Sequence, residues 1–231
     1  MKFSSIKQSH RFSHIFLPYV KTPIRCSIDN KRVYVIDSHI LFSVTTVLSC
    51  RGKTEIDEWK NAVGSIQAKK VSHVASTKGT ALHEFCEYYL TNRDVNPLIK
   101  NDQFAYIRYK NIQSTLDKIN NIYCIERGLY SLKMKMAGTV DCIAEYDGML
   151  SVIDFKTSKK LKGEWEIPQY FAQTAAYAVM FEEMYNIKVR QLVIIMSVEG
   201  ISTPSVFISQ FNKHTNYLKE TIQMFRKGLH D

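Results

Sequence analysis

Paired cysteines, long apolar runs and internal repeats are all missing from this sequence of 231 residues. The cysteine count is odd and no C-x-x-C pair occurs, which argues against a disulfide framework and against a zinc ribbon. We therefore expect free thiols in a reducing compartment. No apolar run approaches the roughly 18 residues of a membrane span, so no membrane helix is predicted. The cysteines are Cys26, Cys50, Cys86, Cys124 and Cys142.

Acidic residues are fewer than basic residues in this sequence. The 31 basic and 22 acidic residues give a formal net charge of +9, which favours polyanions such as nucleic acid or an anionic membrane surface, or serves solubility alone. The first 25 residues contain no acidic residue, as in a mitochondrial transit peptide, but lack a clear arginine-rich amphipathic pattern and a secretory apolar core. A composition rich in Lys, Ile and Asn favours a phage protein in the host cytoplasm over a mitochondrial one.

The periodicity of apolar residues changes along the chain. An extended arm over residues 1–30, broken by Pro18 and Pro23, precedes a largely helical stretch and then a meander of strands. This order predicts an α/β domain with a central mixed sheet flanked by helices. Helices are predicted over residues 43–49, 54–73, 79–91, 98–120, 166–185 and 211–228, and strands over residues 32–36, 122–132, 136–146, 149–156, 190–198 and 204–209.

A two-residue turn at Asp147-Gly148 fixes the register of the meander, because an Asp-Gly pair between alternating strands favours a tight hairpin. In that register Asp141 and Asp154 are direct cross-strand neighbours on one face, with β-carbons roughly 4.5–5.5 Å apart. Lys156 lies two residues beyond Asp154 and emerges on the same face. The alternative is a surface hairpin with charged residues on its solvated face.

Two adjacent carboxylates destabilise an empty sheet, and a hard divalent cation removes that cost. Mg²⁺ prefers carboxylate oxygens together with water and phosphate oxygens. A lysine beside such a cation can orient or deprotonate a water, or neutralise charge on an attacked phosphate. The hairpin therefore predicts a metal-assisted hydrolytic centre.

These residues resemble the PD-(D/E)XK nuclease superfamily, in particular its RecB-like exonuclease branch. The family motif is an aspartate after Gly-x-x, then Asp/Glu-x-Lys on the next strand, here Gly138–Asp141 and Asp154–Lys156. Three further family features occur in order: Gly-Thr-x-x-His at Gly79–His83, a glutamate on the preceding strand at Glu126, and Gln-x-x-x-Tyr at Gln173–Tyr177. Within the branch the chain is similar to mitochondrial genome maintenance exonucleases and their phage-encoded relatives over about residues 30–200.

The resemblance implies a restriction-endonuclease-like core with a helical N-terminal insertion. It divides the chain into an arm and short strand (1–40) and one nuclease domain (41–231), whose residues 41–120 are a helical DNA-binding part and 121–231 the catalytic sheet. The implied activity is a Mg²⁺- or Mn²⁺-dependent DNA exonuclease that prefers single-stranded ends. No iron–sulfur cluster is expected, because the four-cysteine pattern of the cluster-bearing branches is missing.

The resemblance also implies roles for single residues. Asp141, Asp154, His83 and the backbone carbonyl of Phe155 would bind the metal. Lys156 would act as the general base or orient the phosphate.

Three family positions carry alternatives. Glu126 is a catalytic metal or water ligand, or else a satisfied strand carboxylate. Gln173 and Tyr177 contact DNA near the cleaved phosphate, or else pack as a polar helix edge on the sheet.

Basic residues near these motifs are candidates for phosphate contacts. Lys159, Lys160 and Lys162 follow the catalytic lysine closely in sequence, and Arg108 lies in a segment where basic and aromatic residues alternate. For that segment the alternative is a solvated face over an aromatic helix core.

Three other functions stay open on sequence alone. They are a structure-specific endonuclease on the same scaffold, a nucleic-acid-binding protein without catalysis, and a basic scaffolding protein. The sequence does not give cleavage polarity or oligomeric state.

Overall fold

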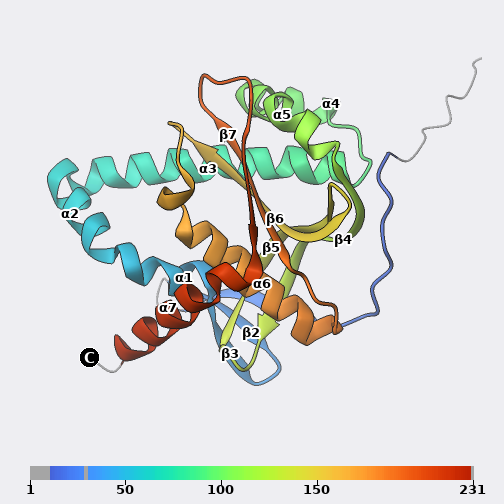
Figure 1. The fold of residues 1–231 in the computed structure, drawn as a ribbon. Helices are drawn as coiled ribbons and strands as arrows, with labels where there is room; N and C mark the ends of the chain where they lie inside the picture. The colour runs from blue at the N-terminus through green and yellow to red at the C-terminus, as the bar shows by residue number, and fades with distance from the viewer. Residues whose placement is uncertain (1–10, 29–30, 230–231) are drawn as a thin grey trace, which may run out of the picture.

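A computed structural model describes residues 11–28 and 31–229. The described residues form one eight-stranded mixed sheet with helices on both faces, as the periodicities predict (Figure 1). The order along the sheet is β1-β2-β3-β5-β6-β7-β8, and β4 pairs with the other edge of β5. The strands are β1 (Ile24–Ile28), β2 (Lys31–Ile36), β3 (His39–Ser43), β4 (Ile119–Ser131), β5 (Met136–Tyr146), β6 (Met149–Ser158), β7 (Gln191–Val198) and β8 (Ser205–Gln210).

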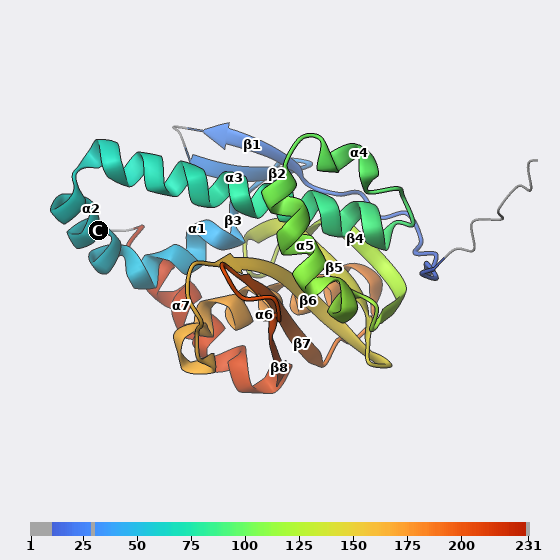
Figure 2. The same ribbon diagram turned by 90° about the horizontal axis from the view of Figure 1, so that it is seen from above.

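Two apolar cores lie on opposite faces of the sheet, giving three layers (Figure 2). One core packs α6 against the sheet, with α1 and α7 beside it, and the other packs the second half of α3 together with α5. The α-helices are α1 (Val44–Leu48), α2 (Lys53–Val63), α3 (Ser65–Leu90), α4 (Asn96–Ile99), α5 (Gln103–Leu116), α6 (Pro168–Tyr185) and α7 (Thr215–Lys227), with short 3₁₀ turns η1 (Ser49–Gly52), η2 (Glu164–Glu166) and η3 (Phe211–His214).

The N-terminal part differs from its prediction in two ways. The expected arm over residues 1–30 contains β1, and β3 adds a further strand that was not predicted; residues 1–10 and 29–30 lie outside the described residues. The helix expected over 54–73 breaks at Gly64, and α3 then continues through the gap expected before residue 79. Gly64 ends α2 because its φ of +82° is open to glycine at little cost.

The predicted helix over 98–120 is also too long. It divides into α4 and α5, and β4 already begins at Ile119. Asp102 starts α5 by accepting a hydrogen bond from the Ala105 N–H, which is an N-cap that a continuous helix would not need. No helix within residues 11–28 and 31–229 is long and apolar enough to cross a membrane. All five cysteines are free thiols, as expected.

Candidate nuclease centre at a split in the sheet

The centre of the sheet opens along one edge of β5. That edge pairs with β3 at Met136 and Ala137, and with β6 only from Cys142 onward. Residues 138–141 between these two ladders have no partner on this edge. A strand with free backbone groups on one edge can receive side chains from outside the sheet, so the split is a natural place for a site.

The predicted hairpin register is confirmed. Asp147 and Gly148 form the turn with φ of +48° and +78°, Tyr146 pairs with Met149, and the ladder runs as far as Cys142 and Ile153. One step beyond the ladder stand Asp141 and Asp154. There the Phe155 N–H donates to Asp141 Oδ2 at 2.8 Å, so a carboxylate replaces the next backbone pair.

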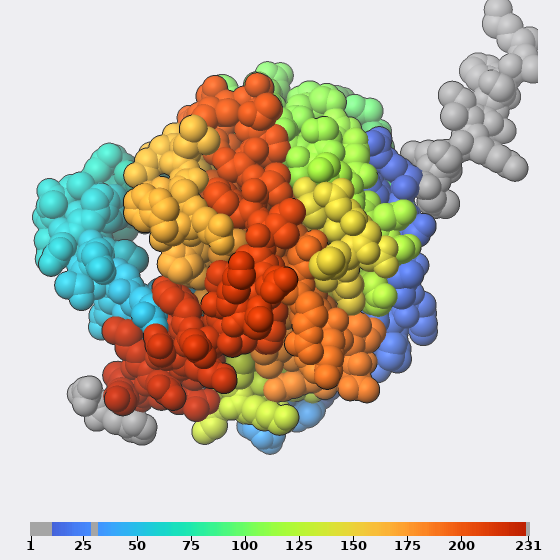
Figure 3. Space-filling view, in the orientation of Figure 1, coloured from blue at the N-terminus to red at the C-terminus, as the bar shows by residue number. Residues whose placement is uncertain are grey.

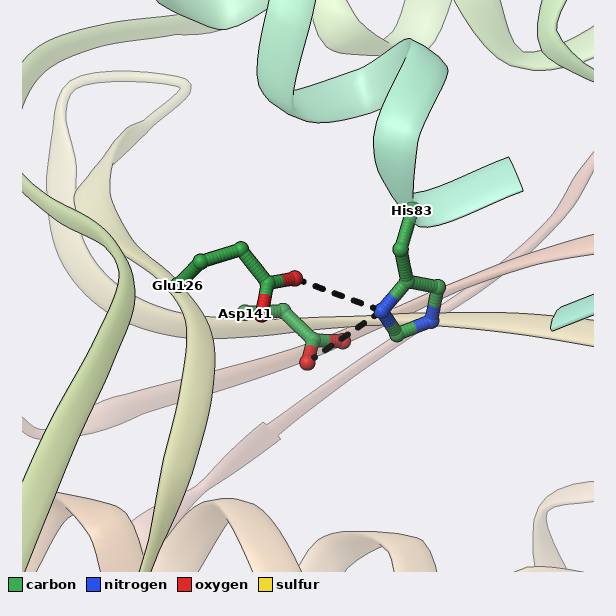
Figure 4. Close-up of side chains that lie close together, drawn as sticks. All are labelled: His83, Glu126 and Asp141. Carbon is green, nitrogen blue, oxygen red and sulfur yellow. Dashed lines mark ion pairs between the residues drawn. The ribbon is translucent and has the colours of Figure 1, made fainter. Parts of the chain in front are cut away.

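Glu126 stands opposite Asp141 on β4, between the paired residues Ile125 and Arg127. Its φ of +45° is in the left-handed region, which costs a non-glycine residue about 1–3 kcal/mol. Residues with such strained backbone conformations cluster at functional sites. The kink carries the Glu126 side chain toward His83 (Figure 4). The partner of this strand carboxylate is thus the histidine of the predicted site.

His83 reaches both carboxylates from α3. Its Nδ1 lies 3.5 Å from Glu126 Oε1 and 3.5 Å from Asp141 Oδ1, while its Nε2 lies 2.8 Å from the Phe155 carbonyl oxygen. A carbonyl oxygen only accepts, so Nε2 carries a proton and Nδ1 is the nitrogen that faces the two carboxylates. This is how second-shell hydrogen bonds orient ligating histidines.

The charge around His83 is strongly negative. Burial lowers the pKa of the imidazole, but Asp141 and Glu126 outweigh it and raise the pKa to about 9. Ligand atoms of His83, Glu126 and Asp141 all lie within 4.8 Å of one another. At neutral pH the ring therefore carries a second proton on Nδ1, and a divalent cation of the Mg²⁺ or Mn²⁺ type held by His83 and the two carboxylates would replace that proton.

Asp154 lies apart from this cluster, in an ion pair with Lys156. The carboxylate is 1% exposed, and neither of its oxygens has a hydrogen bond of good geometry even though the ammonium is in contact. Burial, reinforced by Asp141, raises the pKa of Asp154 to about 6 against the opposing effect of Lys156. Such an underused buried carboxylate has spare oxygens for a cation or a water.

Lys156 keeps its proton in this setting. Burial lowers the pKa of the ammonium, but Asp154 and then Asp141 outweigh it, so the pKa is raised. Its Nζ also donates to Gln173 Oε1 at 3.4 Å and lies 5.1 Å above the Tyr170 ring. A charged lysine held between acceptors suits the orientation and neutralisation of a phosphate better than proton abstraction.

The structure places the predicted ligands in two neighbouring groups. The structure brings together His83, Asp141 and Glu126, whereas Asp154 sits with Lys156 and the Phe155 carbonyl is engaged as the acceptor for His83. Asp141 also accepts a hydrogen bond from the Phe155 N–H, and it lies close enough to Asp154 to raise the pKa of that carboxyl group.

Residues of α6 close the other side of the split. Tyr177, predicted to contact DNA, is 3% exposed, and a β-carbon at Gly138 would lie 2.7 Å from its Oη. Tyr177 therefore packs into the place that Gly138 leaves free and is not available as a surface contact. Sequence reasoning missed Tyr170, although its spacing of three from Gln173 and seven from Tyr177 places all three on one face of a helix.

The basic residues predicted to contact phosphates differ in how exposed they are. Lys159 and Lys160 are exposed, Lys160 being 3.8 Å from Glu166. Lys162 donates to the Tyr170 hydroxyl at 3.4 Å, which places its ammonium on the same ring as Lys156. Arg108 is partly exposed on α5, and among the described residues no hydrogen bond or ion pair joins it to the cluster around His83.

Comparison with curated proteins finds relatives of this chain. Three relatives are named mitochondrial genome maintenance exonuclease 1. The mouse (Mus musculus) protein is 42% identical over 60 residues, covering 26% of this chain and 17% of that protein. The human (Homo sapiens) protein is 28% identical over 141 residues, covering 55% and 39%, and the Xenopus tropicalis protein is 33% identical over 84 residues, covering 34% and 23%. Each match thus spans less than half of the relative's own length.

A solved structure titled "Crystal structure of SSO0001" covers 82% of this chain and 79% of that chain, at 13% identity and a TM-score of 0.40. The family model described as the PD-(D/E)XK nuclease superfamily matches residues 56–226. That match takes in His83, Glu126 and the Asp141–Lys156 hairpin, and with it most of the sequence. The chain belongs to the PD-(D/E)XK nuclease superfamily.

Proposed function

We propose that this nuclease is a divalent-metal-dependent DNA exonuclease that acts on single-stranded ends. The observation that carries the proposal is the cluster of His83, Glu126 and Asp141 beside the Asp154–Lys156 pair, at the split of the sheet. Relatives named as exonucleases support the end-directed reaction.

One group of residues would bind the cation, and Lys156 would bind the phosphate. His83 Nδ1 and the carboxylates of Glu126 and Asp141 would hold the cation, with Asp154 next to them across the β5–β6 hairpin. Such a cation supplies Lewis-acid stabilisation of phosphate oxygens and lowers the pKa of a water. Lys156, charged and aimed by Asp154 and Gln173, binds a non-bridging phosphate oxygen and orients the scissile group.

The preference for single strands is supported by the helices before the catalytic strands. The projecting pair, defined as α2 with the first half of α3 (Lys53–Gly79), stands away from the body, and Figure 3 shows an opening between it and the segment that precedes α6. The pair exposes apolar side chains, among them Trp59 and Ile66, and carries lysines such as Lys69 and Lys70. Aromatic and basic side chains together suit unpaired bases and their phosphates.

The test uses two forms of one substrate. End-labelled linear single-stranded DNA and a covalently closed circle of the same sequence are incubated with the protein in Mg²⁺, Mn²⁺ or EDTA. We expect loss of the linear form only, and only with metal. Lys156→Ala is expected to lower the rate at least about a hundredfold, whereas Lys219→Ala, which removes an exposed lysine on α7, leaves it unchanged.

Cleavage of the circle would transfer the assignment to an endonuclease, since an exonuclease needs an end. Binding of DNA without degradation in either metal would contradict the catalytic assignment and favour a binding protein.

A further inference from the structure

Trp165 is the feature near the site that catalysis does not use. It lies in η2, in the connection from β6 to α6, and its side chain is 83% exposed. A tryptophan offers the largest aromatic surface of any residue and is seldom left open to water without a use. Lys159, Lys160 and Lys162 precede it closely in sequence, and Glu164 and Glu166 flank it directly.

The indole is held in place despite its exposure. A β-carbon at Gly163 would lie 2.5 Å from Trp165 Nε1 and 2.9 Å from its Cδ1, so the ring lies directly on the backbone of Gly163. The Gly163 N–H donates to Glu166 Oε2 at 2.8 Å, and the Glu166 N–H donates to the Gly163 carbonyl at 3.0 Å. Ile167, fully buried, anchors the end of this loop. One side of the ring is thus supported by the chain while most of its surface faces solvent.

A single side chain connects this loop to the catalytic lysine. The ring of Tyr170 carries Lys162 Nζ at 5.3 Å from its centroid and Lys156 Nζ at 5.1 Å. The two ammonium groups therefore lie within the reach of one aromatic ring, and Trp165 is three residues further along the loop. A nucleic-acid backbone bound at Lys156 would continue past Lys162 with its bases free to meet the indole.

We propose that Trp165 is a stacking platform for an unpaired base of the bound strand, next to the phosphate held by Lys156 and Lys162. The inference rests on the proposed function, because it takes its ligand to be single-stranded nucleic acid. Stacking on a supported ring is tolerant of base identity, since every base has a π-face. The platform would hold a strand by its bases while the lysines hold it by its phosphates.

Intrinsic fluorescence reports on this directly, because the sequence has only two tryptophans. Trp59→Phe leaves Trp165 as the single indole. This variant is titrated with oligothymidylate in EDTA, where no cleavage occurs, and binding is followed in parallel by the anisotropy of labelled DNA. We expect saturable quenching of Trp165 with the same midpoint as the anisotropy. An abasic oligonucleotide of equal length should bind through its phosphates without quenching.

Three variants distinguish the contribution of the Trp165 ring itself from the contribution of its position. Trp165→Ala is expected to weaken oligothymidylate binding roughly tenfold while leaving abasic binding unchanged, and Trp165→Phe should retain most of the affinity. Gly163→Ala keeps the indole but displaces it, so an intermediate loss is expected. Thermal unfolding checks the fold, which none of these changes should alter much because the ring is exposed.

The outcomes keep the two proposals apart. Binding with no quenching, and with Trp165→Ala as tight as the wild type, would overturn the stacking platform and leave the exonuclease proposal intact. Quenching and base-dependent loss in a protein that degrades neither linear nor circular DNA would support the platform while the exonuclease proposal fails.

Discussion

The projecting pair and the rest of the molecule, here called the body, both carry many apolar residues. These residues are buried in the body and largely exposed in the projecting pair. In the body, apolar residues of β7 such as Ile194 are fully buried between α6 and the sheet. In the projecting pair, α2 has no buried residue, and Ile66 at the start of α3 is 73% exposed. Apolar residues therefore build a core in one region and an open surface in the other.

The difference shows what periodicity can and cannot predict. A stripe of apolar residues shows that one helix face seeks an apolar partner, but it does not say whether that partner belongs to the same chain. In the projecting pair the main contacts of α2 are with α3 and η1. Its remaining apolar surface is available to a bound strand, which is how the proposed function uses it.

The largest expected effect comes from truncating one isoleucine side chain to alanine in each region. Ile194→Ala removes fully buried methyl groups and should cost roughly 2–5 kcal/mol of unfolding free energy through lost burial and a cavity. Ile66→Ala should change stability by no more than about 0.5 kcal/mol, because the side chain is mostly in water and alanine favours a helix. Urea unfolding of both variants gives the comparison, and comparable losses would show that the projecting pair is packed like the body.

A second pair of substitutions should move stability in opposite directions. Gly138→Ala places a β-carbon against the buried Tyr177 ring and is expected to cost roughly 1–3 kcal/mol. Gly79→Ala, in α3, meets nothing within 4 Å and should add roughly 0.5–1 kcal/mol, since alanine is the better helix former.

Adding Tyr177→Phe to Gly138→Ala removes the nearest atom, at 2.7 Å, but leaves a ring carbon at 2.9 Å. Part of the loss should therefore be recovered in the double variant. A shift of the same sign for the two alanine variants, seen by thermal or urea unfolding, would contradict the assignment of Gly138 to a tight contact.

Sequence alone predicts the local part of the site well. The turn at Asp147-Gly148 and strict alternation fix the β5–β6 register, because a slip of one residue would expose the whole buried set. The long strands and α6 are also predicted, because the periodicity of their apolar residues is clear. β1 and β3 escape prediction because they are short, and β3 gains its place through a parallel pairing with β5 almost a hundred residues away.

The contact between Glu126 and His83 could not be predicted from the sequence. Glu126 reaches His83 only because its backbone adopts a left-handed φ of +45°, and glutamate gives no sequence signal for that conformation. Asp141 leaves its strand partner because the sheet splits at this point, which depends on where β3 stops. Non-local geometry thus determines which of the predicted side chains contact one another, whereas local pattern identifies the side chains themselves.

A third prediction concerns charge on the projecting pair. Lys69→Ala with Lys70→Ala should lower the affinity for single-stranded DNA at low salt. If both lysines contact phosphates, the slope of log K against log salt falls by about 0.7 for each. Lys219→Ala with Lys227→Ala on α7 removes the same charge from exposed positions of the body and should leave the slope unchanged. Equal slopes in the two double variants would mean that the DNA does not follow the projecting pair.

The smallest effect lies at the surface of the body, where His214 is packed more closely than its exposure suggests. Its ring stacks on Phe171 with centroids 4.4 Å apart, and its Nε2 lies 2.8 Å from Ser209 Oγ. Burial lowers the pKa of His214 below 6.5, against an opposing effect of Glu164. Between the lowered pKa and 6.5 the unfolded chain binds more protons, so this contribution to stability is present above 6.5 and is lost as pH falls.

His214→Gln retains an amide that can bond Ser209 and removes the titration. The fall in Tm between pH 7.5 and pH 5.5 should therefore be smaller in the variant than in the wild type. Asp154, with its pKa raised to about 6, acts in the opposite sense: the folded state binds more protons there, so its contribution is lost as pH rises toward 6. Only the difference between variant and wild type isolates His214, because Asp154 is the same in both. Identical pH profiles would show that the stacked ring is as free to ionise as one in water, and that the outer layer of the body is as open as the projecting pair.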